Sequence, residues 1–367
     1  MGATPITSID PAGLAALTGL RCTSPFLGAA WLRASISTWS GHADVSSLDW
    51  PLANGGRAHA LIGRRRQVRR GGLVRPMTIA LNASMQDALD AVFIERNGFH
   101  GVPEDGFEDA LDGFLDALEA LPPWDELRLP GLSLAQVERV RTAVSGRGWR
   151  VSDEEIRPAY LLDLDAVRAN GADFLASRSS NTRQQLRRAR RQIEAALGPL
   201  RLEAAATASQ ALEWFDACAP LHRARWSAER GGSGFDLPGF VAFHRAMIGN
   251  DFGSVQLLRL SAGERVVAYL YNLVCDAYVG FYLSAIDYAV GDSYRPGMLA
   301  HWLAIEHHIA GGARTYDFLA GENRYKRSLS DTAYTQHWLT IRRPGLVLAA
   351  EHLGRRIKER LRATPAA

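Results

Sequence analysis

The sequence predicts a mixed α/β fold, with an α+β mixed sheet, built from two similar halves. Short apolar runs alternate with segments whose apolar residues recur every three to four positions, as in strands and helices. The order helix, antiparallel strands, helix, strand, helix, strand occurs twice, without a close sequence repeat. A chain of 367 residues is expected to form about two domains. We expect an N-terminal domain at 1–165, a C-terminal domain at 166–343, and a C-terminal helix and tail at 344–367.

The first half is expected to alternate strands with two helices. Strands are expected at 60–68, 73–82, 91–95 and 125–131, with a strand or connector at 151–164. The stretch 107–121 has its apolar residues at helical spacing and stops at Pro122-Pro123. A second helix, at 132–149, can begin with Ser133 as its N-cap.

The second half is expected to repeat this alternation with more helices. Helices are expected at 177–198, 208–230, 238–250, 297–310 and 322–329, and strands at 314–319 and 334–342. The stretch 254–286 comprises three β-runs joined by two tight turns. A final amphipathic helix is expected at 346–361, because its leucines and isoleucine form one stripe.

The composition is that of an ordinary globular protein. A net charge of +3 is too small to argue for nucleic acid as the partner. The three cysteines are far apart, odd in number and without a C-x-x-C motif, so neither a disulfide framework nor a zinc site is expected. We expect no signal peptide and no membrane insertion, because the first residues lack an apolar core and no apolar run has membrane-spanning length. The expected location is the reduced cytoplasm.

One predicted helix start has the composition of an anion site. Pro296 suits the first turn of a helix, and Gly297 lets a ligand approach the backbone. The free N–H groups and the positive dipole end attract anions, and Arg295 lies beside them. The expected ligand is the pyrophosphate of a coenzyme A thioester, held by Arg295, Gly297, Met298 and Leu299. The alternative is an ordinary loop-to-helix start, because Pro-Gly is common in turns.

The segment TYDFLAGENRYKRSLSD at 315–331 joins an apolar strand to a short charged helix. Open α/β sheets bind ligands at the C-terminal ends of their strands, so Tyr325 and Lys326 are expected to face the same cleft. A lysine can stabilise negative charge on a carbonyl oxygen, and a tyrosine can give a proton to a departing thiolate. Asp317 is either an acid–base group or a structural anchor of the turn. The alternative for Lys326-Arg327 is a solvated helix face.

Together these motifs resemble the CelD-type, or BioF2-like, acyltransferases of the GNAT superfamily. The matching residues are Pro296-Gly297, Asp317-Phe318-Leu319, Gly321-Glu322 and Tyr325-Lys326-Arg327. The upstream stretches TRQQLRRARRQIE and LHRARW are also similar to that family, so the resemblance covers about 175–343. In the first half, FIERNGF at 93–99 is similar to an E-Y-N-G strand end of some relatives, with Arg96 in place of the tyrosine.

The resemblance implies tandem GNAT-like domains, the first one degenerate, related to the Fem-type aminoacyltransferases. It implies direct transfer of an acyl group, acetyl foremost, from acyl-CoA to an amine of a small molecule, amino sugar or peptide. Lys326 matches the lysine that supports the transferred carbonyl in Fem-type enzymes. The candidate catalytic residues are Lys326, Tyr325 and Asp317, and the candidate substrate-binding residues are Tyr282, Glu322, Glu95 and Asn97. The general base stays open among Asp317, Glu322 and Glu95.

Two other function classes remain open. An aminoacyl-tRNA-dependent peptide ligase of the Fem type would use the arginine runs at 63–70 and 178–191, which are otherwise solvated faces. The second is a non-catalytic GNAT-like module in polysaccharide synthesis. No metal is expected, because His301, His307 and His308 lack the spacing of metal ligands, and they are expected to be exposed or core histidines.

Overall fold

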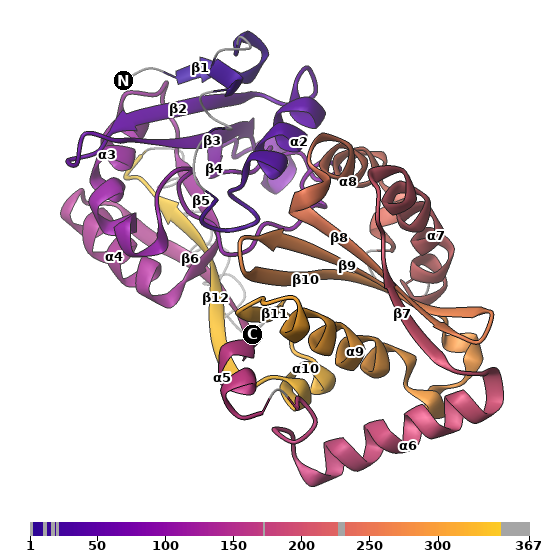
Figure 1. Cartoon of the computed structure of the whole chain (residues 1–367). Helices are drawn as coiled ribbons and strands as arrows, with labels where there is room; N and C mark the ends of the chain where they lie inside the picture. Colours follow the sequence, from indigo (N-terminus) through magenta and orange to yellow (C-terminus); the bar gives the residue numbers. More distant parts are fainter. Residues whose placement is uncertain are drawn as a thin grey trace, which may run out of the picture. The chain divides into compact units, whose positions relative to one another are not determined.

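The computed structural model describes residues 3–9, 13–15, 19, 22–171, 173–226 and 232–345. The chain divides into two compact units, the first made of 1–27, 39–156 and 336–367 and the second of 28–38 and 157–335. Alternating helices and strands confirm the expected mixed α/β class (Figure 1). The helix expected at 346–361 lies outside the described residues, as does the end of the helix expected at 208–230.

The first unit contains strands in the order β1-β2-β3-β4-β5-β12. They are β1 (Ala3–Pro5), β2 (Val45–Pro51), β3 (Arg57–Arg66), β4 (Met77–Leu81), β5 (Glu126–Ser133) and the 336–342 part of β12 (Thr332–Arg342). Neighbouring strands are antiparallel except for β4 and β5, which pair in parallel over three residue pairs. Short 3-10 helices η1 (Ile6–Ser8), η2 (Arg70–Gly72) and η3 (Glu104–Gly106) lie between them.

The helices of the first unit follow from local sequence. In α3 (Phe107–Glu119), the apolar residues at helical spacing are all buried, and the helix ends before the two prolines, as expected. In α4 (Leu134–Gly146), Ser133 is the N-cap. Its hydroxyl accepts from the Gln136 N–H at 3.4 Å, and the Gln136 side chain accepts from the Ser133 N–H at 2.8 Å. This capping box satisfies two donors that the helix leaves unpaired.

The second unit contains strands in the order β6-β11-β10-β9-β8-β7. They are the 157–163 part of β6 (Arg150–Asp163), β7 (Leu200–Ala204), β8 (Val255–Ala262), β9 (Arg265–Cys275), β10 (Tyr278–Ile286) and β11 (Thr315–Ala320). The expected meander of three strands with two tight turns is confirmed as β8, β9 and β10. The pair β10–β11 is parallel and the other pairs are antiparallel.

Helices cover both faces of this second sheet (Figure 1). They are α2 (Ala29–Trp39, all but its last residue), α5 (Leu164–Ala169), α6 (Ser180–Leu197), α7 (Ala208–Trp226), α8 (Pro238–Asn250), α9 (Pro296–Ala310) and α10 (Arg324–Leu329). The 3-10 helices are η4 (Gly234–Asp236), η5 (Phe252–Ser254), η6 (Tyr288–Val290) and η7 (Asp292–Tyr294). Figure 1 shows α6, α9 and α10 on one face and α7 and α8 on the other.

Alternate residues of the second sheet face these two layers, as the period of a strand requires. Leu270 packs in one core with Leu186 of α6 and Ile305 of α9. Its neighbour Tyr271 faces the other layer, where its ring lies 5.9 Å from that of Phe215 in α7. The sheet is therefore buried on both sides.

The strands of the two units are arranged in the same order. Each has an antiparallel meander, β2-β3-β4 or β8-β9-β10, whose last strand pairs in parallel with a later strand, β5 or β11. Each parallel ladder contains three residue pairs. The rhythm of elements that the sequence shows twice therefore corresponds to a repeated topology.

Two expectations need correction. The strand expected at 91–95 is wrong, because these residues form irregular backbone and Phe93 is exposed. The expectation of reduced thiols is wrong for Cys22 and Cys275, which are both disulfide-bonded, whereas Cys218 is a buried free thiol.

Within the described ranges, no helix combines the length and apolar character needed to cross a bilayer. The same residues contain no cluster of acidic, histidine or cysteine side chains that could hold a metal ion.

Candidate functional site

The candidate site begins where β10 and β11 separate. Their parallel ladder runs from Tyr278↔Thr315 to Gly280↔Asp317, although β10 continues to Ile286. Both strands are irregular directly after the ladder, since the pairing of β10 with β9 shifts between 281 and 283 and that of β11 with β6 shifts between 317 and 320. Such bulges bend a strand and end its pairing. The C-terminal half of β10 therefore has an open edge toward β11.

The helix start of α9 lies beside this opening. Arg295 adopts a left-handed conformation (φ 46°, ψ 50°) and is the N-cap residue, and Pro296 occupies the first turn. The first turn of a helix leaves backbone N–H groups without helical partners. Gly297 lies against β10, since a Cβ built there would be in ordinary contact with the Ile286 side chain, at 3.5 Å.

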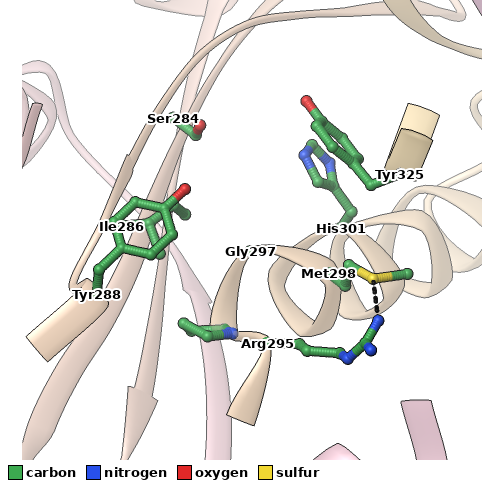
Figure 2. A pocket seen from close by; sticks show the side chains of 9 residues that line it. Ser284, Ile286, Tyr288, Arg295, Gly297, Met298, His301 and Tyr325 are labelled. Atoms are coloured by element: carbon green, nitrogen blue, oxygen red, sulfur yellow. Dashed lines mark hydrogen bonds between the residues drawn. The ribbon is translucent and has the colours of Figure 1, made fainter. Parts of the chain in front are cut away.

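A pocket of about 210 Å³ lies between the end of β10, the start of α9 and α10 (Figure 2). Its lining residues are Ser284, Ile286, Tyr288, Arg295, Pro296, Gly297, Met298, His301 and Tyr325. Three of the four residues expected to bind the donor, Arg295, Gly297 and Met298, line this pocket. The fourth, Leu299, is fully buried in the core and does not line it.

The rim of the pocket is cationic. The Arg295 guanidinium donates to the Gln185 side chain of α6 at 2.9 Å and lies 3.8 Å from the Met298 sulfur (Figure 2). Further along α6, Arg187, Arg188 and Arg191 are exposed. Positive side chains thus continue from the rim onto the surface of α6.

His301 is one of the lining residues that the sequence did not indicate, together with Ser284, Ile286 and Tyr288. Its imidazole is stacked on the Tyr325 ring, with centroids 5.1 Å apart and planes at 19°, and Phe281 meets it edge-on at 4.4 Å. Its Nδ1 lies 3.0 Å from the hydroxyl oxygen of Tyr316. One signal could have identified it: His301 lies four residues after Gly297, hence on the same face of α9.

Three histidines of the second unit, His244, His301 and His308, are buried. Burial lowers the pKa of each to about 3, with a further lowering from Lys326 for His301 and from His307 for His308. Desolvation disfavours the charged imidazolium. The imidazole that faces the pocket is therefore uncharged at neutral pH.

Tyr325 comes from the first turn of α10. The Asn323 side chain caps this helix by accepting from the Tyr325 N–H at 3.2 Å. Burial, followed by the neighbouring Tyr288, raises the pKa of Tyr325 above its ordinary value. Its hydroxyl therefore keeps its proton at neutral pH and can act as a donor in the pocket.

Lys326 lies next to Tyr325 but does not line the pocket. Its ammonium donates to the carbonyl of Ala320 at 2.7 Å and to that of Leu319 at 3.3 Å. Gly321 at this turn has φ +114°. The side chain is buried, so the solvated helix face considered for it is wrong. In this structure the hydrogen bonds of Lys326 hold α10 against the end of β11.

Asp317 is fully buried at the point where the ladder ends. Its carboxylate accepts from the Tyr278 and Tyr334 hydroxyls at 2.7 Å each and from the Leu319 N–H at 2.7 Å. Leu319 has φ +60°, a conformation that costs a side-chain-bearing residue about 1–2 kcal/mol. These contacts make Asp317 an anchor of the turn that carries β11 into α10.

The remaining predicted residues of the second unit lie elsewhere. The Tyr282 ring packs among Trp31, His244 and Tyr271, with centroids 5.0–6.2 Å apart, and does not line the pocket. Glu322 is exposed, accepts from the Tyr160 hydroxyl at 2.7 Å and forms an ion pair with Arg327.

Glu95 and Asn97 belong to the first unit, where their surroundings are structural. The Asn97 N–H donates to Gly131 of β5 at 2.9 Å, and the amide of Asn82, which follows β4, donates to Asn97 at 2.8 Å. The segment around Asn97 thus bridges the ends of the parallel pair in this unit. Glu95 accepts from the Gln336 amide at 2.6 Å.

Comparison with known proteins agrees with this geometry. Residues 180–327 match the family model described as an acetyltransferase (GNAT) domain. FemX is similar in structure with a TM-score of 0.57 at 10% identity, covering 92% of this chain and 97% of that one. No match was found among curated proteins.

Two further solved structures are similar over most of the chain. One is the C-terminal domain of a protein described as a lysylphosphatidylglycerol synthetase from Agrobacterium fabrum (TM-score 0.52, 14% identity, 92% of this chain and 93% of that one). The other is L-PGS from Bacillus licheniformis (TM-score 0.51, 12% identity, 96% and 97%). At such identities the likeness concerns the fold alone. The part of the chain that contains the pocket has a GNAT-like acyltransferase fold.

Proposed function

We propose that this chain is an N-acyltransferase of the CelD-type, BioF2-like group, transferring an acyl group, acetyl foremost, from acyl-CoA to an amine. The acceptor is an amine of a small molecule, amino sugar or peptide. The observation that carries this proposal is the parallel pair β10–β11, which separates after three residue pairs beside the start of α9. The first unit has the same topology, but there the segment around Asn97 bridges the ends of the parallel pair β4–β5. This supports a degenerate GNAT-like domain in the first unit.

The chemistry of the lining residues fits a coenzyme A thioester. Arg295 and the N–H groups at the start of α9 suit phosphate oxygens. Ile286 and Met298 supply apolar walls for the uncharged arm of the donor. The side chains of His301 and Tyr325 also line the pocket, and His301 contacts Phe281, the first residue of β10 beyond the ladder. In this proposal the acyl carbonyl lies beside these two side chains.

The reaction requires one bond to form and one to break. The amine nitrogen bonds to the acyl carbon, the carbon–sulfur bond breaks, and one amine proton ends on the sulfur. Tyr325 suits the last transfer, because its protonated hydroxyl can give a proton to the thiolate and recover one from the amine. We assign Lys326 and Asp317 to positioning, since both fasten the turn that carries Tyr325.

Titration calorimetry with acetyl-CoA tests the proposal. Wild-type protein is expected to bind, and Arg295→Ala is expected to weaken binding about tenfold, in the range of a lost hydrogen bond to a charged group. Arg245→Ala is the matched control, because Arg245 is an exposed arginine paired with Asp216 outside the pocket. Absence of heat with the wild type overturns the proposal.

A second candidate is an aminoacyl-tRNA-dependent peptide ligase of the Fem type. The observation that favours it is the group of exposed arginines Arg187, Arg188 and Arg191 on α6, the helix whose Gln185 accepts a hydrogen bond from Arg295 at the pocket. Uncharged tRNA should then bind with an affinity that falls steeply between about 50 and 200 mM salt, and the triple alanine variant should reduce that slope. Binding of tRNA without binding of acetyl-CoA selects this candidate. Binding of neither leaves the non-catalytic module.

A further inference from the structure

We propose that His301 is a fixed, uncharged hydrogen-bond donor whose Nε2–H binds the carbonyl oxygen of the acyl group during transfer. This inference rests on the proposed function and assigns a residue to its central step. It starts from the position of His301, which lies on α9 four residues beyond Gly297 and lines the pocket together with Tyr325 (Figure 2).

The imidazole is held on several sides. Phe281 of β10 and Phe318 of β11 have ring centroids 4.4 and 5.3 Å from that of His301, and the Tyr325 ring of α10 is stacked on it. Only 2% of the residue is exposed. A donor fixed by packing needs no reorganisation when charge develops, which is the property of an oxyanion-binding group.

The hydrogen bond to Tyr316 determines which ring nitrogen carries the proton. Tyr316 is fully buried, and among the described residues its hydroxyl has one hydrogen-bond partner, Nδ1 of His301 at 3.0 Å. A buried hydroxyl that does not donate loses a hydrogen bond worth about 1–3 kcal/mol. Tyr316 therefore donates to Nδ1, and the hydrogen of the neutral ring lies on Nε2.

The protonation state supports the same role. Because burial lowers the pKa of His301 to about 3, the ring is too weak a base to take a proton from an amine at neutral pH, and it cannot act as an imidazolium. A neutral N–H donor is the remaining function. As the amine attacks, the carbonyl π electrons move to oxygen, and the Nε2–H bond to that oxygen strengthens until the carbon–sulfur bond breaks.

The location agrees with the reacting end of the donor. His301 contacts Phe281, the first residue of β10 beyond the ladder, whereas the cationic rim lies at Arg295. A thioester that has its phosphates at the rim and its arm along β10 presents its carbonyl near His301.

The experiment compares two probes, acetyl-CoA and S-ethyl-coenzyme A, which lacks the carbonyl oxygen. Wild-type protein is expected to bind acetyl-CoA about fivefold to tenfold more tightly, or about 1–1.4 kcal/mol. In His301→Phe the two affinities should become equal within about twofold. His301→Gln, whose amide can place a donor near Nε2, should restore part of the difference. His308→Phe is the matched control, because this buried histidine of α9 does not line the pocket.

A preference for acetyl-CoA that persists in His301→Phe overturns the inference while the proposed function stands. Failure of the wild type to bind either probe overturns both. A second measurement needs no ligand: long-range proton–nitrogen NMR correlations of labelled histidine should show Nδ1 of His301 without a hydrogen. Tyr316→Phe should abolish that tautomer preference. A hydrogen found on Nδ1 of the wild-type residue overturns the inference by itself.

Discussion

Replacing Asp317 should destabilise the turn that leads from β11 into α10. In Asp317→Ala, two tyrosine hydroxyls and the Leu319 N–H lose the acceptor that each now has at 2.7 Å. A hydrogen bond to a charged group contributes about 1.5–3 kcal/mol, and water can replace part of this at the two half-buried tyrosines, so the expected loss is about 3–5 kcal/mol. That is a large part of the 5–15 kcal/mol that stabilises a typical protein.

The assay is urea unfolding followed by tryptophan fluorescence, with the midpoint and slope measured for each variant. Tyr278→Phe and Tyr334→Phe each remove one donor and should each cost about 1 kcal/mol. Combined with Asp317→Ala, either tyrosine variant should add less than its single effect, because the partners are coupled. Asp317→Asn keeps the shape and should fall between wild type and Asp317→Ala.

Two outcomes would refute the structural role of Asp317. One is a loss below about 1 kcal/mol in Asp317→Ala, because the loss of three hydrogen bonds to one carboxylate, two of them only partly replaceable by water, should cost more than that. The other is an Asp317→Asn variant with wild-type stability whose turnover falls more than a thousandfold, as expected of a general base. The anchor role predicts instead that turnover and stability fall together across the series.

Three further predictions concern the turn, the backbone and pH. Lys326→Ala should lower turnover about a hundredfold in a steady-state assay, because α10 loses its ties to two carbonyls; wild-type turnover would contradict this. Gly263→Ala should destabilise more than Gly312→Ala in urea, because both have positive φ but only a Cβ at Gly263 meets a carbonyl, at 2.0 Å; equal losses would count against it. His244, His301 and His308, the buried histidines described in the second unit, titrate near 6.5 when unfolded and near 3 when folded, so stability should fall as pH drops below 6.5, by up to about 1.4 kcal/mol per pH unit each. His244→Phe should reduce that slope, which thermal melts at pH 4–7 can measure.

Several elements of the fold could be predicted from the sequence, because each is specified by interactions between residues that are close together in the chain. The apolar spacing of α3, the capping box at Ser133 and the meander β8-β9-β10 all depend on neighbours within a few residues. The expected strand at 91–95 failed for the opposite reason. Its β-forming residues lead into Asn97, which bonds to Gly131 of β5 and to Asn82 after β4, so this part of the chain contacts residues distant in sequence instead of pairing as a strand.

The candidate site shows the same division. The motifs around Gly297 and Tyr325 indicated that two segments border one ligand, and the structure places both at one pocket. Residue type alone could not show that Leu299 points into the core or that Lys326 is bound to carbonyls. Such directions depend on how each helix rotates against the sheet.

By itself, the sequence indicated the class of fold, the repeated order of elements and two of the segments that line the pocket, around Gly297 and Tyr325, because periodicity and turn residues act over a few positions. The tertiary structure alone decided which side chains face the pocket. His301 is the clearest case: its burial, its uncharged ring and its bond to Tyr316 arise because β10, β11 and α10 pack against α9.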